Sequence, residues 1–297
     1  MVTTMLILIS DKFDENMPKA LSRFGEVTND QKRAPEAEII LVRSKTKCTK
    51  EYIDAAPKCK LIIRGGVGLD NIDVPYAKSK GIIVKNTGEA STVAVAEMAF
   101  ALMIALPNHI ARADASMREG KWLKSELERT ELYGKMLGIL GMGRIGTALA
   151  IRAKAFKMNV LAWHPDVFFS DFAEIIEPIE EVVAKSDYIS MHMPKLPDTK
   201  GIVNKNLLGK FKKGAYLINT GRGECVIEED VVEALKSGQL AGFATDVWYS
   251  DPPVNSPLMN APNTLFAPHL GSSTKENMGR ISTMAEMIIA DYVKTNK

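Results

Sequence analysis

Three polar residues in the second half of the chain each follow a short apolar segment. Arg222 lies in NTGRG after AYLIN, Asp246 follows AGFAT, and His269 lies in APHLG after TLF. Because parallel strands end at one edge of a sheet, and that edge lines the ligand crevice, we expect these side chains to lie together. Singly, each has an ordinary explanation: a surface ion pair, a turn or helix cap, and a buried hydrogen-bonded imidazole. Their coincidence favours a functional site.

This combination of residue types suits hydride transfer at a carbon that bears a hydroxyl group. The planar guanidinium of Arg222 can bind a carboxylate through two parallel hydrogen bonds. The imidazole of His269, with an ordinary pKa of about 6.5, can take the hydroxyl proton as the hydride leaves and return it during reduction. A neighbouring carboxylate would hold the imidazole in one tautomer, and Asp251 and Asp246 are the candidates.

A glycine-rich turn offers a place for a dinucleotide. The sequence GMGRIG, residues 141–146, follows an apolar strand and precedes a helical stretch and a second strand. Gly141 permits the tight turn, Gly143 lets a pyrophosphate approach the backbone, and Gly146 lets the helix pack closely on the strand. The alternative is a tight strand-to-helix turn without a ligand. The complete strand-turn-helix-strand context favours dinucleotide binding.

The end of that second strand departs from the usual dinucleotide pattern. An acid about 20 residues after the turn normally binds the ribose hydroxyls, but here the position is His164, with Asp166 two residues later. A histidine would tolerate a 2′-phosphate, so we expect NAD, with NADP as a second possibility. The alternative is that His164 is a loop residue that packs beside the adenine.

Short aliphatic segments recur between helical stretches and predict strands in two series. The predicted strands are residues 6–9, 38–42, 61–63 and 82–84, and then 137–140, 159–163, 188–191, 215–219, 241–245 and 264–267. This alternation favours an α/β fold with parallel sheets covered on both faces. One unit would end near Ala90 and another begin near Val93, with the site in the cleft between them. Periodicity leaves open whether the last helix, 275–297, returns to the first unit.

Composition narrows the class of protein. The 297 residues are 46% hydrophobic and 25% charged, which is typical of a globular protein and excludes wholesale disorder. The net charge of +2 does not indicate nucleic acid. Three cysteines without C-x-x-C spacing favour a reducing, cytoplasmic compartment. The apolar stretch 93–106 is shorter than the roughly 20 residues of a membrane span, so we interpret it as a buried helix and expect no membrane partner.

With these residues in place, the chain resembles the D-isomer-specific 2-hydroxyacid dehydrogenase family along nearly its whole length. The resemblance is carried by RGGVGLDNID (64–73), GILGMGRIG (138–146), NTGRG (219–223), DVWYSDPP (246–253) and PHLGSST (268–274). It implies two Rossmann-like, doubly wound domains. Residues 1–92 and 275–297 would form a flavodoxin-like substrate domain, and residues 93–274 an NAD(P)-binding domain. It also implies a homodimer built largely by the cofactor domain.

The resemblance assigns roles to the strand-end residues. Arg222 would hold the substrate carboxylate, and His269 would be the acid/base. The place of the family's partner glutamate is taken by Asp251, which is one methylene shorter, so its contact with His269 must be re-formed by a backbone shift or be weakened. Asp246 would lie near the nicotinamide.

Further cofactor and substrate contacts follow from the same resemblance. The expected cofactor-binding residues are Gly141, Gly143, Arg144, Ile145, Gly146, His164, Met193, Pro194, Thr220, Arg222, Asp246, His269 and Gly271. The backbone of Gly66, Val67 and Gly68 matches the loop that receives the substrate carboxylate. Arg43 and Arg64 match arginines that bind a substrate phosphate in family members acting on 3-phosphoglycerate. Among those members, the chain is most similar to the short form, which has no regulatory domain. That substrate would place the enzyme in serine biosynthesis.

Several alternatives stay open. Glyoxylate or hydroxypyruvate reduction is the main rival, and Arg43 and Arg64 would then lack a phosphate to bind; ordinary strand-end solvation is their other explanation. The family's usual NTPEA segment is NTGEA here, and Gly88 leaves that loop looser, which bears on substrate choice. DVWY is similar to formate dehydrogenases, which carry glutamine in place of Asp251, but NTGRG fits hydroxyacid enzymes better.

Two readings come from other classes. Some relatives are cofactor-sensing modules that bind a partner protein, but a sensor needs no proton acceptor, so the retained arginine, carboxylate and histidine argue against this. An inactive paralogue is the second, and Asp251 is its one hint. No metal is implied, because the four histidines lie on separate segments without ligand spacing.

Overall fold

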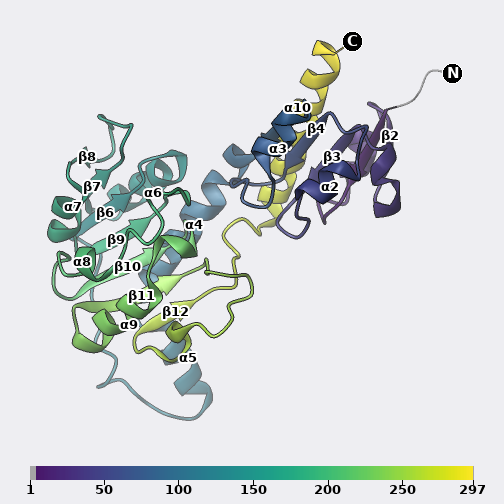
Figure 1. Ribbon diagram of the computed structural model, residues 1–297. Helices are drawn as coiled ribbons and strands as arrows, with labels where there is room; N and C mark the ends of the chain where they lie inside the picture. The colour runs from purple at the N-terminus through teal and green to yellow at the C-terminus, as the bar shows by residue number, and fades with distance from the viewer. Residues whose placement is uncertain (1–4, 297) are drawn as a thin grey trace. The chain divides into compact units, whose positions relative to one another are not determined.

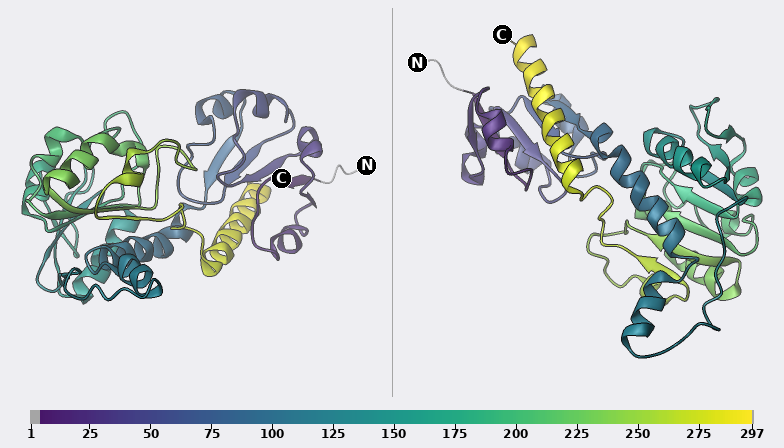
Figure 2. Two further views of the ribbon diagram at one scale, coloured as in Figure 1. Left: turned by 90° about the horizontal axis from the view of Figure 1, so that it is seen from below. Right: turned by 180° about the vertical axis from the view of Figure 1, so that it is seen from behind.

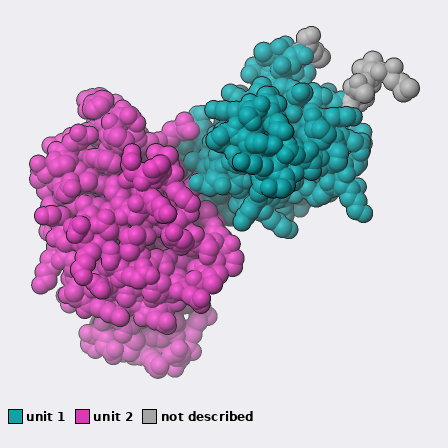
Figure 3. Space-filling model, viewed as in Figure 1, with its two compact units in different colours: residues 1–92, 272–297 teal, residues 93–271 magenta. Residues whose placement is uncertain are grey.

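The computed structural model describes residues 5–296, and two parallel sheets with flanking helices dominate it (Figure 1; Figure 2). These residues form two compact units, one of residues 5–92 and 272–296 and one of residues 93–271 (Figure 3). The predicted fold class, α/β with parallel sheets, is confirmed.

The smaller unit contains a parallel sheet whose described strands run in the order β2-β1-β3-β4-β5. The strands are β1 (Leu6–Ile9), β2 (Glu26–Thr28), β3 (Ile39–Val42), β4 (Leu61–Arg64) and β5 (Ile83–Asn86). The helices are α1 (Met17–Leu21), η1 (Gln31–Glu36), α2 (Lys50–Asp54), α3 (Val74–Ser79), η2 (Gly88–Ser91) and α10 (Lys275–Thr295). The strand order reverses between β1 and β3, so we expect ligand-binding residues just after the carboxyl ends of these two strands.

Alternate strand residues of this sheet enter two separate cores, as the pleat of a strand requires. Leu6 and Leu8 of β1 pack on the face that holds Ile53 of α2, whereas Ile7 packs on the face that holds Ile281 of α10. Helix α10 therefore belongs to the same unit as β1, which answers the question that periodicity left open (yellow in Figure 2).

The larger unit contains a parallel sheet whose described strands run in the order β12-β11-β10-β9-β6-β7-β8. The strands are β6 (Met136–Leu140), β7 (Asn159–Trp163), β8 (Glu174–Ile175), β9 (Tyr188–Met191), β10 (Ala215–Asn219), β11 (Leu240–Thr245) and β12 (Thr264–Phe266). Chain order runs outward in both directions from β6 and β9. The point between those two strands is the topological switch point, where open α/β sheets bind ligands.

Helices cover both faces of the larger sheet. They are α4 (Thr92–Ala105), α5 (Ile110–Arg118), α6 (Arg144–Ala155), α7 (Ile179–Lys185), α8 (Lys205–Leu208), η3 (Gly223–Cys225), α9 (Glu228–Ser237) and η4 (Pro257–Asn260). Ile139 of β6 packs in the core that α4 and α6 cover, and Leu140 packs in the core that α7, α8 and α9 cover.

The apolar stretch that contains α4 is the one candidate membrane span among the described residues. Residues 88–105 are long and apolar enough by composition alone, and half of the stretch is buried inside the protein. Ala96, Ala99 and Met103 of α4 are buried in the core of the larger unit. The same pattern is found in core helices of water-soluble domains, and the prediction of a buried helix agrees with this packing.

The ten predicted strands all occur, with ends within two residues of the prediction. Two short strands, β2 and β8, were not predicted. Both are at a sheet edge, and neither contains a fully buried residue. Without an apolar run they give no strand signal, because pairing with a neighbour rather than burial holds them in place. The three cysteines are buried and free.

Candidate active site

The glycine turn after β6 has the geometry that a pyrophosphate needs. Gly141 has φ +104°, and a Cβ atom there would lie 3.0 Å from the carbonyl carbon of His192. A Cβ on Gly146 would lie 2.5 Å from the carbonyl oxygen of Gly141, so α6 packs closely against the turn. Gly143 caps α6 without a side-chain hydrogen bond, and a Cβ there would meet nothing within 4 Å. The amino terminus of α6 is therefore open to an anion.

His164 directly follows β7, and its ring is engaged by its own loop. Nδ1 accepts a hydrogen bond of 3.0 Å from the backbone N–H of Asp166. The Asp166 backbone therefore shapes the loop, and Nδ1 carries no proton in this arrangement. A neutral ring of this tautomer presents Nε2–H as a donor, which can bind either a ribose hydroxyl or a phosphate oxygen.

Arg222 lies in a loop that Asn219 organises. The buried Asn219 accepts a hydrogen bond from Gly221 N–H at 3.0 Å and donates Nδ2 to the carbonyl of Arg222 at 3.0 Å. Arg222 Nη1 also donates to the carbonyl of Gly221, at 2.7 Å. A Cβ on Gly223 would lie 2.1 Å from the Trp248 carbonyl carbon, so the loop rests against the segment after β11. These contacts fix the backbone that carries the guanidinium.

Asp246 and Asp251 have different tasks, which resolves the choice that the sequence left open. Asp246 is buried and accepts hydrogen bonds from the N–H groups of Leu270, at 2.7 Å, and Gly271, at 2.6 Å. Burial raises the pKa of Asp246, although these two backbone bonds and the nearby His269 lower it. Asp246 thus holds the backbone that follows His269, and it is Asp251 that bonds to the imidazole.

The imidazole of His269 and the carboxylate of Asp251 form a close pair. Nδ1 of His269 and Oδ2 of Asp251 are 2.5 Å apart, and both side chains are partly exposed, at 40% and 47%. An ionised carboxylate at Nδ1 fixes the Nδ1–H tautomer and leaves the Nε2 lone pair as the base. His269 has φ +56°, a left-handed conformation that is uncommon for a side-chain-bearing residue. The aspartate therefore reaches the histidine despite its shorter side chain.

Arg43 and Arg64 end neighbouring strands in the smaller unit. Val42 of β3 pairs in register with Arg64 of β4, so Arg43 lies one residue beyond that pair at the same sheet edge. Arg43 donates Nη1 to the carbonyl of Lys12 at 3.3 Å, and its Nε is buried without a hydrogen-bond acceptor among the described residues. Burial lowers the pKa of Arg43, although the nearby Asp11 raises it.

The loop after β4 lies directly under Arg64. Gly66 has φ +140°, a backbone conformation that favours glycine, and a Cβ there would lie 1.5 Å from Nη1 of Arg64. The N–H of Gly66 donates to the Thr87 hydroxyl at 2.9 Å. Within residues 5–296, no protein acceptor is found for the N–H groups of Val67 and Gly68. Those two, rather than Gly66, can donate to a substrate carboxylate.

Gly88 starts η2 beside this loop. Its N–H donates to Oδ1 of Asn86 at 3.3 Å, a bond that proline cannot make, and a Cβ there would lie 3.3 Å from Cα of Val67. Asn86 also donates Nδ2 to the Val67 carbonyl at 2.6 Å. Asn86 therefore ties the segment with Gly88 to the loop with Val67.

The structure brings Arg222, Asp246, Asp251 and His269 together on loops that follow β10, β11 and β12 at the carboxyl edge of the larger sheet. Met193 and Thr220 lie on adjoining loops there, and a Cβ on Gly221 would be 2.9 Å from the Met193 carbonyl oxygen. Arg43, Arg64, Gly66, Val67 and Gly68 form a second set at the carboxyl edge of the smaller sheet.

Sequence reasoning missed two residues at these edges. Asp11 follows β1 and accepts hydrogen bonds from the N–H groups of Arg43, at 2.5 Å, and Thr46, at 3.1 Å. His192 follows β9 and contacts the hydroxyls of Ser190 and Thr220. Both obey the strand-end rule that identified Arg222, so the signal was present in the sequence.

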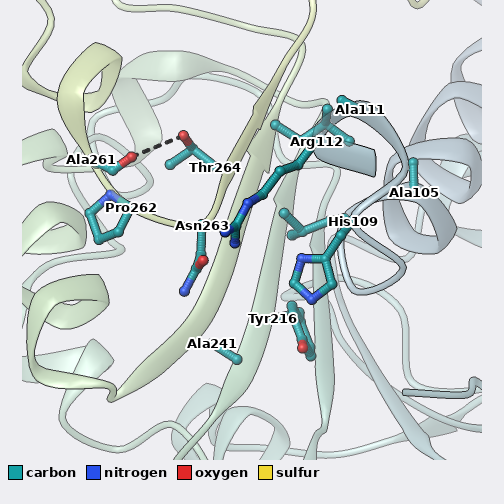
Figure 4. Close-up of a pocket in the computed structure, with 12 residues that line it drawn as sticks. Ala105, His109, Ala111, Arg112, Tyr216, Ala241, Ala261, Pro262, Asn263 and Thr264 are labelled. Atoms are coloured by element: carbon teal, nitrogen blue, oxygen red, sulfur yellow. Dashed lines mark hydrogen bonds between the residues drawn. The ribbon is translucent and has the colours of Figure 1, made fainter. Parts of the chain in front are cut away.

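A cavity of about 400 Å³ lies elsewhere in the larger unit (Figure 4). Its lining includes Tyr216, Ala241 and Thr264, which are near the amino-terminal ends of β10, β11 and β12. Figure 4 shows Arg112 of α5 reaching toward Asn263. The cavity includes none of the predicted site residues, because those follow the opposite ends of the same strands.

A parallel sheet with a glycine turn and an open helix terminus at its switch point defines a nucleotide-binding α/β protein. The family model "D-isomer specific 2-hydroxyacid dehydrogenase, NAD binding domain" matches residues 100–271, and the chain belongs to this family. The predicted family resemblance and the nicotinamide dinucleotide cofactor are confirmed.

Individual relatives carry different names. The chain is 38% identical over 300 residues to D-3-phosphoglycerate dehydrogenase of Methanocaldococcus jannaschii, covering 97% of this chain and 56% of that protein. It is 41% identical over 250 residues to hydroxypyruvate reductase of Thermotoga maritima, covering 83% and 82%. D-lactate dehydrogenase from Aquifex aeolicus, complexed with NAD and lactic acid, has a TM-score of 0.85 at 27% identity, covering 98% and 96%. The chain thus spans about half the length of the phosphoglycerate dehydrogenase that it matches.

Proposed function

We propose that the chain transfers a hydride between a nicotinamide dinucleotide and C2 of a D-2-hydroxy acid. The observation that carries this proposal is the 2.5 Å contact between His269 Nδ1 and Asp251 Oδ2, on loops at the carboxyl edge of the sheet that holds the glycine turn. An acid/base pair placed there supplies the proton transfer that must accompany hydride transfer to or from a hydroxyl-bearing carbon.

The chain's own residues account for the steps around the hydride. The nicotinamide, when bound, takes or gives the hydride. His269 accepts the hydroxyl proton at Nε2 during oxidation and returns it during reduction, while Asp251 stabilises the charged ring through Nδ1–H. Arg222 binds the substrate carboxylate through its planar guanidinium. The turn with Gly143 and the amino terminus of α6 hold the pyrophosphate.

In this proposal the two units divide the work. Residues 1–92 and 275–297 bind the substrate, and residues 93–274 bind the cofactor and supply the acid/base. The protein acts in the cytoplasm as a homodimer. His164 presents a donor rather than an acid to the ribose, so NADP is accepted beside NAD.

The substrate that the arginines favour is 3-phosphoglycerate, with 3-phosphohydroxypyruvate in the reverse direction. Arg64 ends β4, Arg43 directly follows the adjacent strand β3, and a phosphate dianion is a ligand that arginine side chains bind well. Asp11 supports this arrangement because it fixes the backbone of Arg43 through its N–H. Oxidation of 3-phosphoglycerate would place the chain in serine biosynthesis.

Arg64→Ala tests the phosphate reading. We expect kcat/KM to fall about ten- to hundredfold for 3-phosphohydroxypyruvate, because a charged hydrogen-bond partner is lost, and to fall less than threefold for hydroxypyruvate. The measurement is the absorbance of reduced nicotinamide during steady-state turnover. Arg23→Ala is the matched control, since Arg23 is an exposed arginine of the same unit that pairs with Glu286. Equal losses on both substrates would show that Arg64 does not bind phosphate.

Hydroxypyruvate or glyoxylate reduction is the second candidate function. It is favoured by the match to hydroxypyruvate reductase of Thermotoga maritima, of which the chain covers 82%, against 56% of the phosphoglycerate dehydrogenase. Turnover of hydroxypyruvate and glyoxylate without turnover of the phosphorylated pair would select it. No turnover of any of these substrates, with NADH still bound, would instead favour a cofactor-sensing module or an inactive relative.

Asp251→Glu tests whether the shorter acid is adapted to its place. The existing contact is already 2.5 Å, and an added methylene moves the carboxylate by about 1.5 Å. We expect kcat to fall about ten- to hundredfold, because such a displacement disturbs the orientation of the base. Asp251→Asn, which keeps the length but removes the charge, separates geometry from electrostatics. An unchanged or faster rate in Asp251→Glu would mean that the aspartate is a strained substitute.

A further inference from the structure

His192 occupies the switch point of the larger sheet, at the carboxyl end of β9 between β6 and β10. Its backbone N–H donates to the Leu140 carbonyl at 2.8 Å. Its carbonyl group lies against Gly141 so closely that a Cβ there would be 3.0 Å away. The residue therefore touches the glycine turn on one side.

On its other side, His192 contacts the loop that carries Arg222. Nδ1 is 3.3 Å from the Thr220 hydroxyl, two residues before the arginine, and Nε2 is 2.9 Å from the Ser190 hydroxyl. Both hydroxyls are buried. Burial removes water from the His192 imidazole and lowers its pKa to about 4, so the ring is neutral at physiological pH. A neutral ring has one donor and one acceptor nitrogen, and a hydroxyl can complement either.

Other contacts join the same two loops. A Cβ on Gly221 would lie 2.9 Å from the Met193 carbonyl oxygen, so the backbones touch. Lys195 forms an ion pair of 2.8 Å with Glu224, and the Cys225 thiol lies 3.7 Å from the Pro194 carbonyl. These contacts involve residues on both sides of Arg222, but none of them involves the Thr220 side chain. Within the described chain, the one hydrogen bond of that side chain is made with His192.

We infer that His192 is a positioning residue, which fixes Thr220 and thereby holds the backbone of Arg222 in the conformation that binds a substrate carboxylate. The inference rests on the proposed role of Arg222. It assigns a task to a histidine that takes no part in proton transfer. Without His192, the buried Thr220 hydroxyl would lack a hydrogen-bond partner, which costs free energy. The loop would then populate other conformations in which the hydroxyl is bonded.

The experiment measures binding rather than turnover. Oxalate, a small dicarboxylate, is titrated calorimetrically into the full-length protein saturated with NAD⁺, and NADH affinity is measured separately by fluorescence. We expect His192→Leu and Thr220→Val each to weaken oxalate at least fivefold, and His192→Leu to change NADH affinity less than threefold. The double variant should be no weaker than the worse single variant, because both changes break the same bond. His192→Asn, which can still reach Thr220, should recover most of the affinity.

Controls separate this inference from general stability and from the proposed function. Ser186→Ala removes a buried hydroxyl bonded to the Val182 carbonyl at the opposite end of β9, and it should lower Tm without changing oxalate affinity. Arg222→Ala should abolish oxalate binding; if it does not, the proposed function fails. Strong loss in Arg222→Ala with wild-type affinity in Thr220→Val would overturn the inference alone. Thr220→Val preserves side-chain shape, so it decides the matter even where His192→Leu does not fold.

Discussion

Replacing His269 with alanine should lower kcat by about two to four orders of magnitude, the usual contribution of a general acid/base. NADH affinity should change less than threefold. The reason is that the ring bonds to Asp251, whereas the turn with Gly141 and Gly143 is built from other contacts. Steady-state turnover with hydroxypyruvate and 3-phosphohydroxypyruvate, together with an NADH fluorescence titration, measures both quantities.

A second histidine supplies the control for this prediction. His109 precedes α5, has φ +52° and contacts the Glu128 carbonyl, and it lines the cavity at the amino-terminal ends of the strands. His109→Asn tolerates that backbone conformation and should leave kcat unchanged. A His269→Ala variant as active as His109→Asn would exclude His269 as the acid/base.

The strand-end rule explains why so much of the site could be predicted from sequence. Arg222, Asp246 and His269 each follow an apolar segment, and parallel pairing of β10, β11 and β12 brings those ends to one edge. The same rule applied without a preference for familiar motifs would have included Asp11 and His192. They were missed because each stands alone in sequence, and their partners become neighbours only when the sheet forms.

The division of labour between Asp246 and Asp251 could not be predicted, because both are carboxylates within a few residues of the same strand end. The structure decides it through burial. Asp246 is 2% exposed and accepts a backbone N–H on each of its oxygens. Asp251 lies farther along a more exposed loop and can meet the ring. Side-chain reach of this kind depends on loop paths that residue type does not specify.

The substrate loop shows a similar limit. Sequence indicated three adjacent backbone donors at Gly66, Val67 and Gly68, but the N–H of Gly66 is already bonded to Thr87. That bond joins residues 21 positions apart, and it forms because Thr87 immediately follows β5, the neighbour of β4. Periodicity places the strands but does not say which loop atoms remain for a ligand.

Replacing Arg222 with alanine is the second change with a large expected effect. Truncating one partner of a hydrogen-bonded charge pair costs about 2–5 kcal/mol, so kcat/KM for a 2-oxo acid should fall by about thirtyfold to several thousandfold. Stability should change little, because the backbone of the loop is held by Asn219 and by contact of Gly223 with Trp248 rather than by the guanidinium alone. Steady-state kinetics and a thermal melt measure the two effects.

Arg222→Lys distinguishes charge from shape at this position. Lysine retains the positive charge but lacks the planar fork that binds a carboxylate through two bonds, so it should recover only part of the loss. Recovery to the wild-type rate would mean that a point charge suffices and that substrate orientation comes from other residues. A loss confined to NADH affinity in either variant would instead place the arginine on the cofactor and remove it from the substrate. Because the two outcomes affect different binding constants, this pair of variants tests the carboxylate role independently of the proton transfer assigned to His269.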